Sequence, residues 1–423
     1  MRILIKNGRL IDPANDLDGR FDLAIADGKV VAVGPSIGDF HADRQIDAKG
    51  LVVCPGLIDL CARLREPGQE HTATIASETR AAAAGGITTL VCPPDTDPVI
   101  DEPAVAELIR DRWQAAGHAR VLPVGALTVG LAGRQLAELA TLTEAGCVAI
   151  GDGGRPLTDT LVLRRALKYA AGFDLTVMLT PLDPWLAANG CAHDGPVADR
   201  LGLTGIPVAA ESARLARDLD LIADLGVRLH VGRLSSRRAV ELVGMARQRG
   251  LTVSADVSAH QLHLTEHDLG RFDSACHVLP PLRSTTDRDS LRTGLADGTI
   301  SALCSDHQPL DADAKQNPFA DTAPGIAGLD TLLVLGLALV DDQTLTLPTL
   351  IARLTAGPAA VLGLDSGHLA VGAVADVCVF DTNPAHRHWL SAGRNSPFRD
   401  HKLSGRVCHT LLAGRPVYDQ AAP

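Results

Sequence analysis

Short apolar runs and longer amphipathic segments alternate along the middle of the chain. The short runs are rich in Val, Ile and Leu, which predicts buried strands, and the segments between them repeat apolar residues at helical spacing. The predicted strands are 57–60, 87–92, 121–127, 147–150, 175–179, 227–231, 251–257 and 300–304, and the predicted helices are 72–84, 103–116, 135–145, 159–171, 208–225, 237–248 and 287–296. Eight strands with intervening helices predict a closed parallel (β/α)8 barrel, an α/β fold. An open doubly wound sheet is the lesser alternative, because no G-x-G-x-x-G follows the first strand.

The two ends of the chain carry a different pattern. Residues 1–55 hold short alternating stretches separated by turns such as Asn7-Gly8 and Asp27-Gly28, and residues 367–418 have the same character. Such dipeptides between alternating apolar residues are typical of β-hairpins. We therefore expect one small β-sandwich built from both termini, with 1–55 and 367–423 as its two parts and 56–366 as the barrel.

The composition argues against several classes of function and is compatible with this fold. The formal net charge of −11 and the aromatic content of 3% argue against nucleic-acid binding. The nine cysteines are scattered without a C-x-x-C pair, so we expect reduced, buried thiols and neither a disulfide framework nor a zinc knuckle. No apolar run approaches the roughly 20 residues of a membrane span, and the N-terminus lacks the pattern of a signal peptide. These features favour a cytoplasmic protein without a membrane partner.

Chemistry in such a barrel is carried by residues that follow each strand. A metal-dependent amide hydrolase would place a His-x-His pair after the first strand, because alternate residues project to the same side and hold one cation. Here that pair is Cys61 and Arg63, and a guanidinium cannot coordinate a metal. The other strands are followed by Asp95, by Gly153, and by the residues Thr180, Arg233, His260, Asp306 and His307.

The segments PGLIDL, LREPGQEHTATIASETRAAAAGGITTLVC, DTDPVID, GLTGIPVAAE, LPPLRS and SDHQP together resemble class I dihydroorotases of the cyclic-amidohydrolase superfamily. The resemblance covers nearly the whole chain. It implies metal ligands at six positions and a substrate-binding Asn at position 95. The residues at the six positions are Cys61, Arg63, Gly153, Thr180, Arg233 and Asp306, and position 95 holds Asp95. Only Asp306 matches the family's ligand set, while the substrate-gripping arginine is kept as Arg65.

We therefore expect these six positions to be vestigial, with no metal, no cofactor and no catalytic residue. Arg65, Asp95, His260 and His307 would form a vestigial substrate site. Cys61 is more simply a packed thiol than a zinc ligand, and the two histidines are expected to be held by local hydrogen bonds. A buried Asp306 without a metal needs a partner, so we predict an ion pair with Arg63 or Arg233.

The resemblance extends to inactive dihydroorotase-like chains that accompany the catalytic chain of bacterial aspartate transcarbamoylase. It predicts a non-enzymatic structural subunit of pyrimidine biosynthesis that contacts this partner and other copies of itself. Two alternatives remain. One is a divergent but active dihydroorotase or cyclic amidohydrolase, and the other is a non-catalytic binder of carbamoyl aspartate or dihydroorotate, because arginines at a barrel mouth suit carboxylate ligands.

Overall fold

Eight parallel strands form the centre of the molecule in the computed structural model, which describes residues 1–384 and 389–420. Their order around the barrel follows the chain, from the first to the last, and the ends come together through a parallel bridge between Ala62 and His307. The strands are β8 (Leu57–Asp59), β9 (Ile87–Cys92), β10 (Arg120–Ala126), β11 (Ala149–Gly151), β12 (Thr176–Leu179), β15 (Arg228–Val231), β16 (Val253–Ser258) and β17 (Ala302–Cys304). The predicted barrel fold is confirmed.

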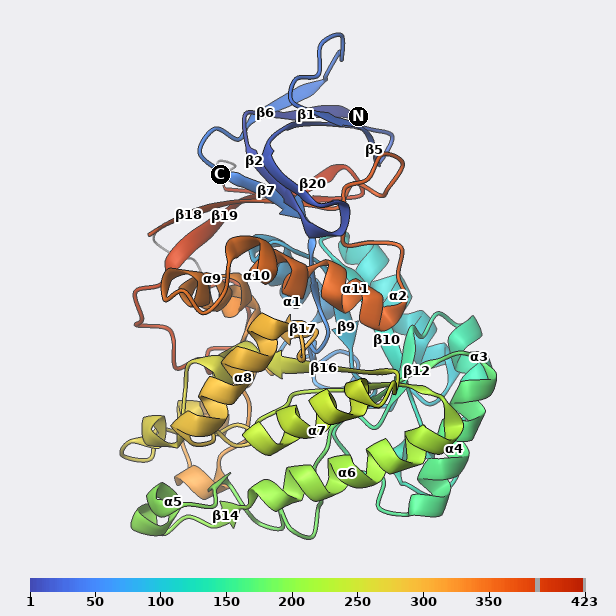
Figure 1. The fold of residues 1–423 in the computed structure, drawn as a ribbon, viewed down its shortest axis with the longest axis vertical. Coiled ribbons are helices and arrows are strands. Elements are labelled where there is room, and N and C mark those ends of the chain that lie inside the picture. The colour runs from blue at the N-terminus through green and yellow to red at the C-terminus, as the bar shows by residue number, and fades with distance from the viewer. Residues whose placement is uncertain (385–388, 421–423) are drawn as a thin grey trace.

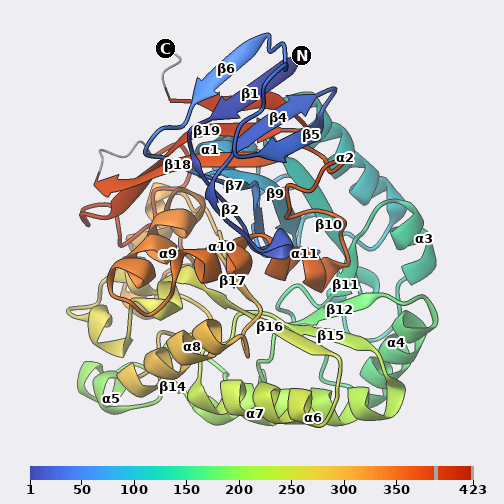
Figure 2. The same cartoon turned by 45° about the horizontal axis from the view of Figure 1, so that its top comes forward.

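Helices surround the barrel, as Figures 1 and 2 show. The helices that follow the strands are α1 (Ile75–Ala84), α2 (Pro103–Ala116), α3 (Leu139–Glu144), α4 (Thr160–Gly172), α6 (Val208–Leu225), α7 (Arg237–Gln248) and α8 (Thr285–Asp297). Additional elements are the short strands β13 (Ala192–His193) and β14 (Gly205–Ile206) and the helices α5 (Pro196–Leu201), α9 (Leu332–Asp341), α10 (Leu347–Leu354) and α11 (Ala356–Leu362). The pattern analysis missed these, and it began the third helix four residues early.

Strands from both termini build the second region, where blue and red strands lie together above the barrel (Figure 1). One sheet has the order β5-β4-β1-β6 and the other the order β20-β19-β18-β7-β2-β3, so β7 and β18 join the two ends of the chain. Their bounds are β1 (Arg2–Lys6), β2 (Arg9–Asp12), β3 (Leu17–Arg20), β4 (Asp22–Ala26), β5 (Lys29–Gly34), β6 (Arg44–Asp47), β7 (Val52–Pro55), β18 (Val377–Pro384), β19 (Ser404–Leu412) and β20 (Arg415–Asp419). The prediction that both termini form one β region is confirmed, and its exact boundaries at residues 55 and 366 stay a prediction.

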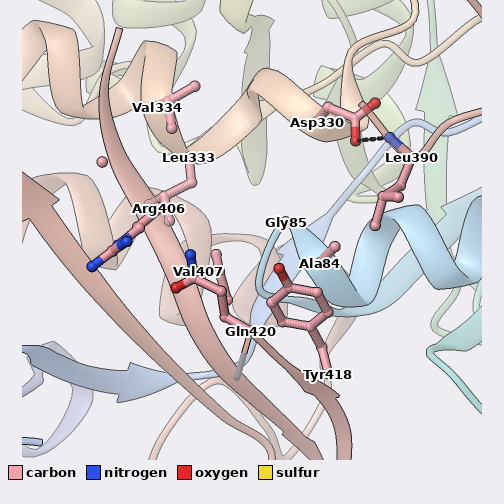
Figure 3. Close-up of a pocket in the computed structure, with 11 residues that line it drawn as sticks. Ala84, Gly85, Asp330, Leu333, Val334, Leu390, Arg406, Val407, Tyr418 and Gln420 are labelled. Atoms are coloured by element: carbon pink, nitrogen blue, oxygen red, sulfur yellow. Dashed lines mark hydrogen bonds between the residues drawn. The ribbon is translucent and has the colours of Figure 1, made fainter. Parts of the chain in front are cut away.

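The C-terminal strands also pack onto the helical layer. Figure 3 shows the small depression where they meet α1, with Tyr418 near Ala84 and Gly85. The Asp330 carboxylate accepts a hydrogen bond of 3.0 Å from the Leu390 amide at its edge. The depression offers only about 50 Å³, which is too little for a metabolite.

No helix in the described part of the chain is both long enough and apolar enough to cross a membrane.

Candidate functional site

The residues singled out from the sequence lie together at the C-terminal end of the barrel. A cluster of buried charges forms its floor. The carboxylate of Asp306, 1% exposed, lies 3.5 Å from Nη1 of Arg63 and 3.2 Å from Nη1 of Arg233, and both guanidinium groups approach the same Oδ1. The predicted pairing of Asp306 is confirmed with both arginines. The guanidinium groups of Arg63 and Arg233 thus lie where the resemblance implies a metal cation.

Other positions of the expected ligand set hold these guanidinium groups in place. The carbonyl oxygen of Gly153 accepts a hydrogen bond of 3.3 Å from Arg63, and the hydroxyl of Thr180 accepts one of 2.6 Å from Arg233. Asp95 accepts a 2.7 Å bond from Nε of Arg63, so it is an arginine partner in this structure. Positions at which the resemblance implies metal ligands therefore hold two arginines in place here.

Burial and the neighbouring charges shift the pKa of Arg233 in opposite directions. Burial has the largest effect and lowers it, but Asp306, Cys61 and Asp256 together hold the pKa above its usual value. The backbone is also unusual here, because Arg65, Arg233 and Asp306 have φ values of 65°, 60° and 45°. Non-glycine residues adopt this left-handed region at an energetic cost, and such residues cluster at functional sites.

Cys61 is a packed thiol. Its Sγ lies 3.6 Å from Oδ1 of Asp306 and 3.9 Å from Arg63. Burial raises the pKa of the thiol well above its usual value, with the neighbouring arginines opposing the shift. The protonated form predominates at neutral pH, and a metal binds the thiolate.

The two histidines near the mouth differ in what their rings can offer. Nε2 of His307 lies 2.9 Å from the carboxylate of Glu78, and its Nδ1 accepts a 3.0 Å bond from the Gly328 amide, so the fold occupies both ring nitrogens. His260 is 2% exposed, its Nε2 has no partner among the described residues, and burial lowers its pKa to about 4. The ring of His260 is therefore neutral.

A cavity of about 410 Å³ opens above this floor. Four arginines line it: Arg63, Arg65, Arg155 and Arg233. Arg65 donates to the Pro309 carbonyl at 2.8 Å and to the Gln69 amide oxygen at 3.2 Å, both neutral acceptors. Sequence reasoning missed Arg155, although an arginine directly after the glycine pair behind the fourth strand was a visible signal.

The residues at the mouth do not fit the metal centre that the resemblance implies. Of the six positions only Asp306 is a ready ligand, and two guanidinium groups surround it. Among the described residues no three His, Cys, Asp or Glu side chains are grouped so that they could hold a metal ion. We therefore derive no chemical step through a metal.

Comparison with known proteins gives the family. The family model for dihydro-orotase-like proteins matches residues 50–239, and the model for the amidohydrolase family matches residues 196–417. A dihydroorotase-like protein of Pseudomonas aeruginosa is 51% identical over 99% of this chain and 100% of its own, and a dihydroorotase of Syntrophotalea carbinolica is 45% identical over 99% of both. The L-hydantoinase of Arthrobacter aurescens shares the fold with a TM-score of 0.88, at 24% identity, over 99% of this chain and 96% of its own.

These relatives correct one prediction. The expectation that the chain is not an enzyme is wrong, because full-length relatives are named dihydroorotase and the matching family model is that of the amidohydrolases, which points to an amidohydrolase enzyme. The exchanged ligand positions are therefore divergence of a site within an enzyme family. The chain belongs to the dihydroorotase-like branch of the amidohydrolase family.

Proposed function

We propose that the barrel mouth binds the anionic substrates of dihydroorotase chemistry, carbamoyl aspartate and dihydroorotate, as a divergent member of that family. The observation that supports this is the charge balance of the cavity. Arg63 and Arg233 are paired with carboxylates, whereas Arg65 and Arg155 line the same cavity without an ion pair among the described residues. Unpaired guanidinium groups in a concave site favour a carboxylate ligand, because their paired N–H donors match its two oxygens.

The size of the cavity supports the same ligand class. Its volume of about 410 Å³ lies in the range of small-molecule sites. Forming or opening the ring of dihydroorotate places negative charge on a carbonyl oxygen. Arg63 and Arg233 are cationic donors fixed at the floor, where such charge would be stabilised without reorganisation.

Calorimetry with each ligand, together with an assay of their interconversion, tests this proposal. We expect both ligands to bind, and we expect Arg65→Gln to weaken binding at least tenfold. Arg110→Gln on α2 is the matched control, because Arg110 is exposed and pairs only with its neighbour Asp111. Absence of binding at millimolar ligand would overturn the proposal, and turnover measured with and without a chelator would show whether the divergent site still catalyses.

We also propose that the chain assembles with the catalytic chain of aspartate transcarbamoylase and with further copies of itself, in the cytoplasm. Two features support this: the sequence resemblance to such companion chains, and full-length relatives that are 51% and 48% identical and are named dihydroorotase-like.

Co-expression with the transcarbamoylase of the same organism tests the assembly. We expect the two chains to elute together and the transcarbamoylase to gain activity or stability. Separate elution at micromolar concentration, with a fully active transcarbamoylase alone, would contradict it.

A further inference from the structure

A second basic cavity lies at the opposite end of the barrel from the mouth. It is lined at the strand N-termini by Thr176, Arg228 and Val253, which are the first residues of β12, β15 and β16. The ends of α7 and α10 add Arg247 and Arg353, and the cavity offers about 420 Å³. The candidate site described above follows the strand C-termini, so the two cavities are separated by the length of the strands.

Two of its guanidinium groups meet at one glycine. Arg247 donates hydrogen bonds to the carbonyl oxygens of Gly298 and, at 3.2 Å, of Thr299. Nη2 of Arg353 lies so close to the same glycine that a Cβ there would be 3.0 Å away. Each arginine in the last turn of its helix is individually favourable, because the helix dipole attracts cations there. The helix dipoles do not explain why the two guanidinium groups lie next to the same glycine, where they repel each other.

Neither Arg247 nor Arg353 forms an ion pair with a carboxylate among the described residues. Nε of Arg353 donates to the Leu295 carbonyl at 2.8 Å, which is again an uncharged acceptor. Arg228 pairs at 3.1 Å with the exposed carboxylate of Asp174, but its own Nε is buried without a partner. Burial lowers the pKa of Arg353 and the positive charge of Arg247 lowers it further, against a smaller opposite effect of Asp297. No Asp or Glu is among the described residues that line the cavity.

We propose that this cavity binds a phosphate monoester, with the phosphate between Arg247 and Arg353. A phosphate carries more charge and more acceptor oxygens than a carboxylate, so it matches Arg247 and Arg353, which have no acidic partner among the described residues. The hydroxyls of Thr252 and Ser301 add donors around it. The cavity is larger than a phosphate alone, and Leu229 and Val361 give the rest an apolar wall for the organic part of the ligand.

Calorimetry with adenosine 5′-monophosphate, inorganic phosphate and adenosine at low ionic strength tests the site. We expect the monophosphate to bind more tightly than inorganic phosphate and adenosine not to bind. Arg247→Gln should weaken binding of the monophosphate at least tenfold, and Arg353→Gln should do the same.

Two matched variants separate this site from other basic surfaces. Arg249→Gln removes an exposed arginine two residues beyond Arg247 that does not line the cavity, and Arg65→Gln alters only the mouth. Both should bind the monophosphate like the unaltered protein. The proposal is overturned if no phosphate compound binds at millimolar concentration, if Arg65→Gln abolishes binding, or if Arg247→Gln leaves it unchanged. Equal affinity for inorganic phosphate and the monophosphate would overturn the assignment of a monoester.

Discussion

At the scale of single residues, the mouth of the barrel shows how a metal position is filled by protein charge. Arg63 and Arg233 stand on neighbouring sides of Asp306, and the pairing could be predicted from the sequence because barrel closure brings the first and eighth strands together. The role of Asp95 as a partner of Arg63 could not, because it depends on the path of the loop after β9, which strand periodicity does not specify.

The buried ion pair makes Asp306 important for stability. Replacing it by alanine leaves Arg233, which is 7% exposed, without its ion pair and next to Arg63, whose remaining carboxylate partner is Asp95. We expect Asp306→Ala to lower the free energy of unfolding by about 3–5 kcal/mol, as when one member of a buried pair is removed. Chemical denaturation measures this, with Asp220→Ala on the exposed face of α6 as the control. A loss below about 1 kcal/mol would mean that the pair does not hold the site together.

At the scale of elements, the pattern of apolar runs found the strands but not the segments between the last strand and the C-terminal sheet. Helix α9 is apolar over most of its surface, and α5, α10 and α11 have only 6, 8 and 7 residues, so none of the four gives a long periodic pattern. Helix starts depend on capping as well. Helix α8, which precedes the eighth barrel strand, begins at Thr285 because Ser284 and Asp287 form a capping box.

Glu78 on α1 connects three elements. Its carboxylate binds His307 at 2.9 Å, the Ser391 hydroxyl at 2.6 Å and the Ala392 amide at 3.0 Å. Burial would raise its pKa, but the hydrogen bonds from His307, Ser391 and the Ala392 amide oppose burial, and the pKa is lowered to about 2. Because this value is below that of the unfolded chain, the carboxylate stabilises the fold above about pH 4.5, and the stabilisation is lost as the pH falls toward 2.

We therefore expect Glu78→Gln to destabilise the protein by about 2–3 kcal/mol at neutral pH, since the charged acceptor is lost. The difference from the unaltered protein should shrink as the pH is lowered from about 4.5. Denaturation at several pH values measures it, and Glu107→Gln on the exposed side of α2 is the control. A difference that stays constant down to pH 3 would disprove the role of the ionised carboxylate.

Asp152, in the turn after β11, has a raised pKa where Glu78 has a lowered one. Oδ1 of Asp152 accepts hydrogen bonds from the amides of Gly154 and Thr180, but its Oδ2 is buried and has no partner in the described part of the chain. Burial raises the pKa of this carboxyl to about 6, so at pH 7 the ionised group costs stability. This cost is fully present above about pH 6 and fades as the pH falls toward 4.

An asparagine at this position keeps the acceptor and removes the charge. We expect Asp152→Asn to raise the free energy of unfolding by about 1–2 kcal/mol at pH 7, and the gain to disappear near pH 4. Asp152→Ala lacks the acceptor for both amides and should destabilise instead. If the asparagine variant is less stable at pH 7, the charge of Asp152 is compensated by groups that the hydrogen bonds do not reveal.

At the scale of the whole molecule, the sequence predicted two regions, and the structure ties them together with polar and apolar contacts. Arg120 on β10 pairs with Asp376 at 2.9 Å, and the Thr410 hydroxyl on β19 donates to the Ala83 carbonyl of α1 at 2.7 Å. One apolar core also includes residues of both regions, among them Leu90 of β9 and Phe380 of β18. Pattern analysis treats each segment separately, so it could not show that the two regions share a core.

A shared core predicts that the barrel and the terminal sheets unfold together. Phe380 is fully buried, and Phe380→Ala should cost about 3–5 kcal/mol through lost contacts and a cavity. Calorimetry should show one transition, shifted to lower temperature, because Phe380 and Val407 of the terminal strands are part of the barrel core. Hydrogen exchange should accelerate equally in β9–β10 and in β1–β4, whereas Phe173→Ala, at a site that is 51% exposed, should change neither. Two separate transitions, or faster exchange confined to the terminal sheets, would show that the barrel is stable without them.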